Sequence, residues 1–154
     1  MTYTILDEPS TGGKLGDFAV RPLWPLLAVM FGGAWLSWPW FAFNAWAVGS
    51  PTRRRETALA AAGFVGAATL FLVLAVMNGN GLIPEGLLPY LGLVLTVWKL
   101  FISYRLYLLQ ARSFYLYEYF GGAVRSGLFV VLIGGFARIQ VLSAVPVFWQ
   151  AVLS

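Results

Sequence analysis

The chain has 154 residues, of which 60% are hydrophobic and only 10% charged, and its net charge is +4. Soluble domains carry about 25% charged residues, so this composition excludes an ordinary water-facing surface and indicates an integral membrane protein. Cys and His are both absent. Their absence excludes disulfides, thiolate nucleophiles, Cys/His zinc sites and imidazole acid–base catalysis.

Four apolar segments are each long enough to cross a hydrocarbon core about 30 Å thick, which takes about 20 helical residues. They cover residues 23–48, 57–77, 82–103 and 128–153. The sequence therefore predicts an all-α membrane protein, a four-transmembrane-helix bundle that forms one polytopic domain over residues 1–154.

The first apolar segment holds three Trp residues spaced by eleven, which places them on one helical face. The outer two, Trp24 and Trp46, would be about 33 Å apart along a straight helix and would suit the two interfacial anchors of one transmembrane helix. Pro39 would kink that helix and Gly32-Gly33 would loosen it. A re-entrant pair of half-helices is the alternative prediction for this segment.

The second apolar segment carries small residues at intervals of four, namely Ala58, Ala62 and Gly66. Such a face lets two helix backbones approach closely in lipid, so these residues are predicted to pack against another helix. The alternative is that Ala and Gly are simply common in transmembrane helices.

Residues 104–127 follow the third apolar segment and interleave Tyr and Phe with Arg105 and Arg112. An interfacial cytoplasmic helix would use such residues, with phenol rings among lipid head groups and bases at phosphates. Gly121-Gly122 is predicted to end this helix before the fourth apolar segment.

Lys and Arg residues gather in the first and third connections between the apolar segments, and the second connection has none. The positive-inside rule therefore predicts that connections one and three are cytoplasmic in a bacterial inner (plasma) membrane and that both termini are outside. If the first segment is re-entrant, the N-terminus lies inside instead.

Five arginines are possible contacts for anionic lipid head groups, because each base near a charged leaflet contributes about 1 kcal/mol. They are Arg53, Arg54, Arg55, Arg105 and Arg112. For the consecutive three, a simple topology signal is the alternative, since lipid-binding clusters hold about four to eight bases.

Arg138 lies ten residues after Leu128, which places it about 15 Å into the fourth apolar segment and near the bilayer midplane. An ionisable residue at that depth is costly unless it is paired or hydrated, so Arg138 is a possible intramembrane functional residue. No acidic residue is predicted at the same depth. The alternative is a structural role for Arg138, in which its guanidinium bonds to helix carbonyls. Lys99 needs no functional explanation, because it can extend its amine toward the interface.

The run GGAWL at 32–36, followed by Asn44, GSP at 49–51 and the arginine cluster, resembles small four-span inner-membrane proteins of proteobacteria. The likeness covers about the first third of the chain and the outline of four apolar segments. It implies a bacterial source and a helical membrane fold, and it implies no activity.

The remaining polar residues include no catalytic set, phosphate-binding loop, cofactor site, metal site or nucleic-acid motif. The first functional hypothesis is therefore a non-catalytic accessory subunit, assembly factor or scaffold, whose partners are membrane lipids and another membrane protein or a second copy of the chain. The alternative is a small transporter, channel or lipid-binding protein that uses Arg138 in the membrane interior.

Overall fold

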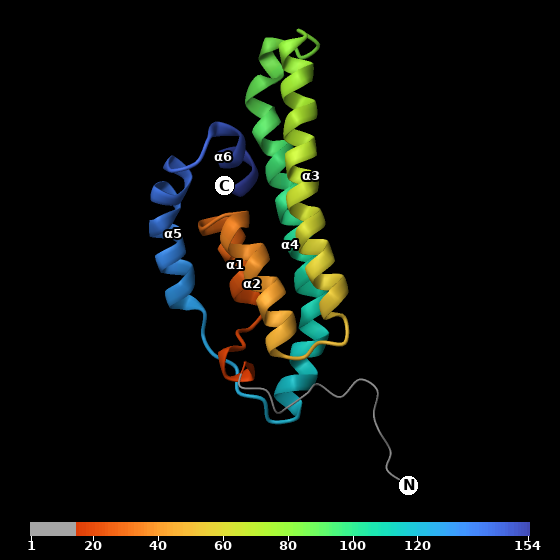
Figure 1. The fold of residues 1–154 in the computed structure, drawn as a ribbon, viewed down its shortest axis with the longest axis vertical. Helices are drawn as coiled ribbons and strands as arrows, with labels where there is room; N and C mark the ends of the chain where they lie inside the picture. The colour runs from red at the N-terminus through yellow and green to blue at the C-terminus, as the bar shows by residue number, and fades with distance from the viewer. Residues whose placement is uncertain (1–14) are drawn as a thin grey trace.

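The structure is a computed structural model and describes residues 15–154. Those residues form helices and no β-strand, which confirms the all-α prediction. The helices are, in chain order, η1 (Gly16–Phe18), α1 (Leu23–Phe31), α2 (Ala34–Ala47), α3 (Arg53–Gly79), η2 (Glu85–Leu87), α4 (Leu88–Tyr119), α5 (Leu128–Ser143) and α6 (Val147–Leu153). Figure 1 shows α3 and α4 as a long antiparallel pair, with the α1/α2 and α5/α6 pairs packed beside part of its length.

The helices α3 and α4 are long and apolar enough to cross a membrane, as judged by length and composition. They have 27 and 32 residues, and at 1.5 Å per residue they are about 40 and 48 Å long. The apolar helix α5 has 16 residues, which gives about 24 Å and is too short to cross in the same way. Among residues 15–154, two helices and not four meet the test, so the predicted four-transmembrane-helix count is not confirmed.

Residues 23–48 form a helical hairpin, α1 and α2, where a single transmembrane helix was the first prediction. The chain breaks at Gly33, whose φ of +104° lies in a region that other residues rarely adopt. Pro39 lies inside α2 and does not end it. The structure therefore matches the alternative of two half-helices, because a glycine in an unusual conformation, and not the proline, reverses the chain.

Hydrogen bonds from α2 back to the start of α1 show that the two helices are antiparallel. Ser37 Oγ donates to Pro25 O at 2.7 Å, and Asn44 Nδ2 donates to Val20 O at 2.7 Å. Because α2 returns to the level at which α1 began, Trp24 and Trp46 lie toward the same end of the hairpin, and they are not the opposite anchors of one helix.

Residues 128–153 are also two helices, α5 and α6, and not the one transmembrane helix predicted. Pro146 separates them with an extended backbone (φ −56°, ψ 154°), since proline has no N–H to continue a helix. The helix α6 folds back onto the core, where Val152 is fully buried. Its end meets the tip of the α1/α2 hairpin, because a Cβ on Gly33 would lie 2.5 Å from Leu153 O.

Residues 104–119 continue α4 without a break, so no separate interfacial helix forms there. No Gly or Pro occurs between Leu93 and Tyr119, and nothing in the sequence therefore ends the helix earlier. The predicted stop at Gly121-Gly122 agrees with the structure, in which Gly121 has a φ of +85° directly after α4.

The chain before α1 lies at the same end of the molecule as the α4–α5 connection. Arg125 N donates to Ala19 O at 2.9 Å, and Arg21 Nε donates to Glu118 at 3.0 Å. The α2–α3 turn lies at this end too (Figure 1). We name it the arginine end, because it carries Arg21, Arg53, Arg54, Arg55, Arg112 and Arg125. Residues 15–21 therefore share an end with connections one and three, contrary to the four-helix topology; residues 1–14 lie outside the described residues.

The core lies where α2, α3, α4 and α6 meet, around Trp38, Phe41 and Leu106, all fully buried. Small residues of α3 make room for these rings: a Cβ on Gly63 would lie 2.9 Å from Ile102 and 3.2 Å from Trp38. The face of α3 that packs inside the chain is therefore Ala60, Gly63 and Ala67, which are buried.

The predicted packing face of α3 is divided by the structure. Ala58 and Ala62 are exposed, whereas Gly66 contacts α4, since a Cβ there would lie 2.2 Å from the Trp98 ring. Gly66 therefore lies against α4, whereas Ala58 and Ala62 are not among the buried residues of α3. Packing of the predicted face against a helix of another chain stays a prediction.

Candidate functional site

A buried hydroxyl and carboxylate cluster lies at the arginine end, where the α2–α3 turn meets α4. Glu56, in the first turn of α3, has no exposed surface. Its Oε1 accepts hydrogen bonds from Ser50 Oγ at 2.7 Å and Thr52 Oγ1 at 2.6 Å. Ser50 Oγ also lies 3.2 Å from Ser113 Oγ on α4. These bonds attach the turn to α4, and the N-terminus of α3 further favours a negative charge at Glu56.

Two oxygen atoms in this region are buried and have no hydrogen-bond partner among the described residues. They are Glu56 Oε2 and Gln110 Oε1. The orientation of the Gln110 amide is set by its nitrogen, because Nε2 donates one hydrogen to Phe41 O at 2.5 Å. An unpaired buried acceptor typically costs about 1–3 kcal/mol, and more when it is charged. The described residues therefore leave two buried acceptors in this region without a hydrogen-bond donor.

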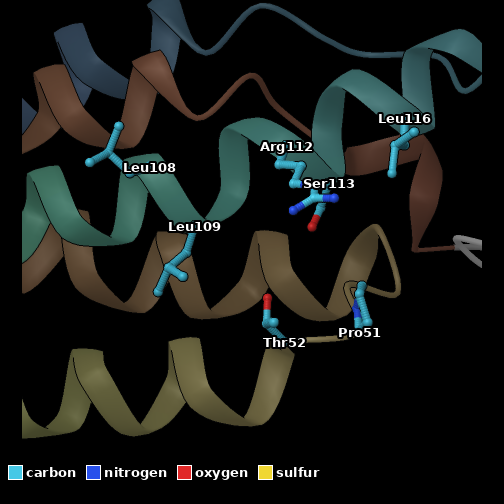
Figure 2. A pocket seen from close by; sticks show the side chains of 7 residues that line it. All are labelled: Pro51, Thr52, Leu108, Leu109, Arg112, Ser113 and Leu116. Carbon is cyan, nitrogen blue, oxygen red and sulfur yellow. The ribbon is translucent and has the colours of Figure 1, made fainter. Parts of the chain in front are cut away.

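A cavity of about 430 Å³ opens beside the cluster. Figure 2 shows Thr52 and Ser113 facing it with their hydroxyl groups, Arg112 next to Ser113, and leucine side chains along α4. Leu108, Leu109 and Leu116 supply its apolar wall. The cavity is thus lined by Thr52, whose hydroxyl binds Glu56, and by Ser113, whose hydroxyl is bonded to Ser50.

A second charged site lies deeper in the molecule, where the tips of the two hairpins meet. Lys99 and Arg138 line one cavity of about 230 Å³, together with Val29, Thr96 and Ser154. No acidic side chain lines it. Lys99 is 5% exposed. Its amine donates to Ala151 O, Ser154 O and Ser154 Oγ at 2.7–3.0 Å.

These three bonds use all the donors of Lys99 and cap the C-terminal end of α6. A cation is favoured there because the helix dipole is negative at that end. Arg138, on α5, is half-buried, and the ion pair found among the described residues, Arg21 with Glu118, does not involve it. The guanidinium is therefore the group with free donors at this cavity, and an anion is the ligand that it suits.

The other predicted arginines lie at the surface and are not brought into one site. Arg53, Arg54, Arg55 and Arg105 are exposed. The Arg53 guanidinium stacks 4.7 Å from the centre of the Trp46 ring, a cation–π contact typical of exposed positions. Arg112 is exposed as well and lines the cavity beside the Glu56 cluster.

Sequence reasoning missed the Glu56 cluster and the position of Lys99 beside Arg138. Glu56 directly follows three arginines and so resembles a surface charge. The signal that was present is the spacing of Ser50, Thr52 and Glu56, which suits side-chain capping at a helix start. Lys99 and Arg138 are on separate helices, and nothing in the sequence shows that α6 folds back to join them.

No protein family, curated protein or solved structure matches this chain. Within residues 15–154, no three His, Cys, Asp or Glu side chains gather as they would around a zinc or similar metal ion.

Proposed function

We propose that this protein is a multi-pass integral protein of a bacterial inner membrane that acts without catalysis, as an accessory subunit, assembly factor or scaffold. The observation that carries this proposal is the exposure of its apolar helices. Only 17% of an apolar 18-residue stretch of α3 is buried, and 25% of the corresponding stretch within Glu85–Tyr119. A soluble protein would cover such helices with its own core. Lipid and partner helices are the surroundings that suit them.

One face of α3 suits a partner helix in particular. It lies opposite the internal face at Gly63 and runs along exposed residues spaced by three and four. Near the arginine end its side chains are small, and farther along they are larger and branched. Small residues allow close backbone approach in lipid. The face consists of Ala58, Ala61, Ala62, Val65, Thr69, Leu72, Val73 and Val76.

The test is co-purification from native membranes in a mild detergent, with mass spectrometry of the bound proteins. We expect the wild type to co-purify with a stoichiometric amount of a second membrane protein. In Ala62→Leu the affinity for that protein should fall about tenfold or more, which corresponds to a loss of about 1.4 kcal/mol of binding free energy. Ala75→Leu is the control, because it makes the same change at an exposed position off this face. A wild type that purifies alone, as a monomer with lipid only, contradicts the proposal; a homodimer identifies a second copy as the partner.

A second function, binding of an anionic lipid or substrate, is favoured by the two cations at one cavity. In native mass spectrometry from mixed lipids, Arg138→Met should retain its fold but lose preferentially bound phosphatidylglycerol. Arg125→Met, which removes an exposed cation that is not among the predicted head-group contacts, should retain it. An unchanged lipid profile in Arg138→Met would exclude this function.

A further inference from the structure

Glu56 and Gln110 lie at the same level of the α3/α4 pair. Gly63 contacts Ile102 and Gly66 contacts Trp98, which fixes the antiparallel register of the two helices. Two helical turns farther toward the arginine end, Glu56 on α3 comes level with Gln110 on α4. The two buried oxygens without partners therefore belong to one layer of the structure.

Both orphan atoms are hydrogen-bond acceptors, and this limits what can satisfy them. With Glu56 ionised, Glu56 Oε2 and Gln110 Oε1 offer lone pairs and no hydrogen. No ion pair among residues 15–154 neutralises Glu56, and a buried, unpaired carboxylate is strongly unfavourable. A cation within reach of both oxygens would satisfy them and would also remove the buried net charge.

We infer that the Glu56 cluster is a binding site for a small monovalent cation such as Na⁺, coordinated by Glu56 and Gln110 with the hydroxyl oxygen of Ser113. Carboxylate, amide carbonyl and hydroxyl oxygens are the ligands of hard cations in proteins. Ser113 Oγ lies 3.2 Å from Ser50 Oγ, whose own hydrogen is donated to Glu56. Ser113 therefore donates to Ser50 and keeps its lone pairs for an ion. The inference is independent of the proposed function.

Charge decides between a monovalent and a divalent ion. The cluster contains one carboxylate, so a monovalent cation leaves it neutral, whereas a divalent cation leaves a buried positive charge. Arg53, Arg54, Arg55 and Arg112 stand near the site and disfavour any cation, but all four side chains are exposed. Solvent and salt screen exposed charges, so their effect is smaller than that of the buried carboxylate.

The ion also has a route to the site. The cavity of about 430 Å³ is lined by Thr52 and Ser113, together with Pro51 of the α2–α3 turn (Figure 2). An ion bound there would join the α2–α3 turn to α4 and would stabilise the folded chain by mass action.

The test is the melting temperature of the detergent-purified wild type in sodium chloride and in N-methyl-D-glucamine chloride, at equal pH and ionic strength. N-methyl-D-glucamine is too large to enter the layer. We expect the melting temperature to be about 2–4 °C higher in sodium. An equal melting temperature in the two salts overturns the inference and assigns the layer to a water molecule, or to a proton if the melting temperature instead varies with pH.

Variants identify the ligands. Glu56→Gln should abolish the sodium effect, and Glu85→Gln, which removes an exposed carboxylate, should retain it. If Glu56→Gln does not fold, Gln110→Glu replaces it: a second carboxylate should shift the stabilising ion from Na⁺ to Ca²⁺. A sodium effect that persists in Glu56→Gln, or a Gln110→Glu variant that calcium does not stabilise, contradicts the assignment.

Discussion

Asn44 binds both backbone groups of Val20: its Nδ2 donates to Val20 O at 2.7 Å, and its Oδ1 accepts from Val20 N at 3.3 Å. Asn44 is fully buried at the end of α2, and Val20 precedes α1. A single side-chain amide therefore links the end of α2 to the residue before α1, with a donor and an acceptor to one residue as a paired β-strand would provide. It satisfies two backbone groups that form no helical hydrogen bond.

Asn44→Ala should lower the free energy of unfolding by about 1–3 kcal/mol, because Val20 N and O lose their partner in a buried place. The measurement is thermal or denaturant unfolding in detergent. Asn78→Ala is the control, since Asn78 is an exposed amide near the end of α3 and should change stability by less than about 0.5 kcal/mol. Equal effects of the two variants would show that the hairpin does not depend on this amide.

Gly66→Ala should destabilise the α3/α4 pair, since the added Cβ would lie 2.2 Å from Trp98 Cζ2. Overpacking of this kind costs about 1–3 kcal/mol. Gly92→Ala makes the same change in α4 where nothing lies within 4 Å, and should stabilise by about 0.5–1 kcal/mol through the higher helix propensity of Ala. Opposite shifts of the melting temperature are therefore expected, and shifts of the same sign would contradict the α3/α4 register.

Cysteine labelling in intact cells tests the membrane location and the hairpin together. The chain has no native Cys, so Asp17→Cys, Pro51→Cys, Ser126→Cys and Asn80→Cys each place a single thiol at an exposed position. The first three lie at the arginine end and should be protected from an impermeant maleimide, whereas Asn80 should react. Reaction of Asp17 together with Asn80 would instead support a first helix that crosses the membrane.

The sequence predicted α3 and the stop after α4 closely, because length, hydropathy and glycine act locally. Residues 57–77 lie inside α3 (Arg53–Gly79), and Gly121 directly follows the residue that caps α4. It did not decide between one helix and two in residues 23–48. That outcome depends on Gly33 reversing the chain and on Asn44 reaching Val20, a contact between residues 24 positions apart.

The small-residue face shows the same limit at the level of one helix turn. Both Ala58-Ala62-Gly66 and Ala60-Gly63-Ala67 are spaced as packing faces. Only the position of Trp38 and Ile102 selects the second one as internal. Periodicity identifies a face, and a partner outside the segment determines which face is used.

The last prediction concerns the coupling between Lys99 and Arg138, which line one cavity. Lys99→Met removes three hydrogen bonds from the end of α6 and should destabilise the folded chain by about 1–3 kcal/mol.

If the cavity holds no anion, the two cations repel each other, so Lys99→Met should cost more when residue 138 is already Met. If an anionic lipid or substrate lies between them, each cation strengthens the other, and Lys99→Met should cost less in that background. A double-mutant cycle of Lys99→Met and Arg138→Met, measured in detergent with and without phosphatidylglycerol, gives the sign of the coupling. About 0.5–3 kcal/mol is expected for groups that share a cavity. A coupling near zero under both conditions would mean that Arg138 and Lys99 act independently, and it would remove the anion-binding function.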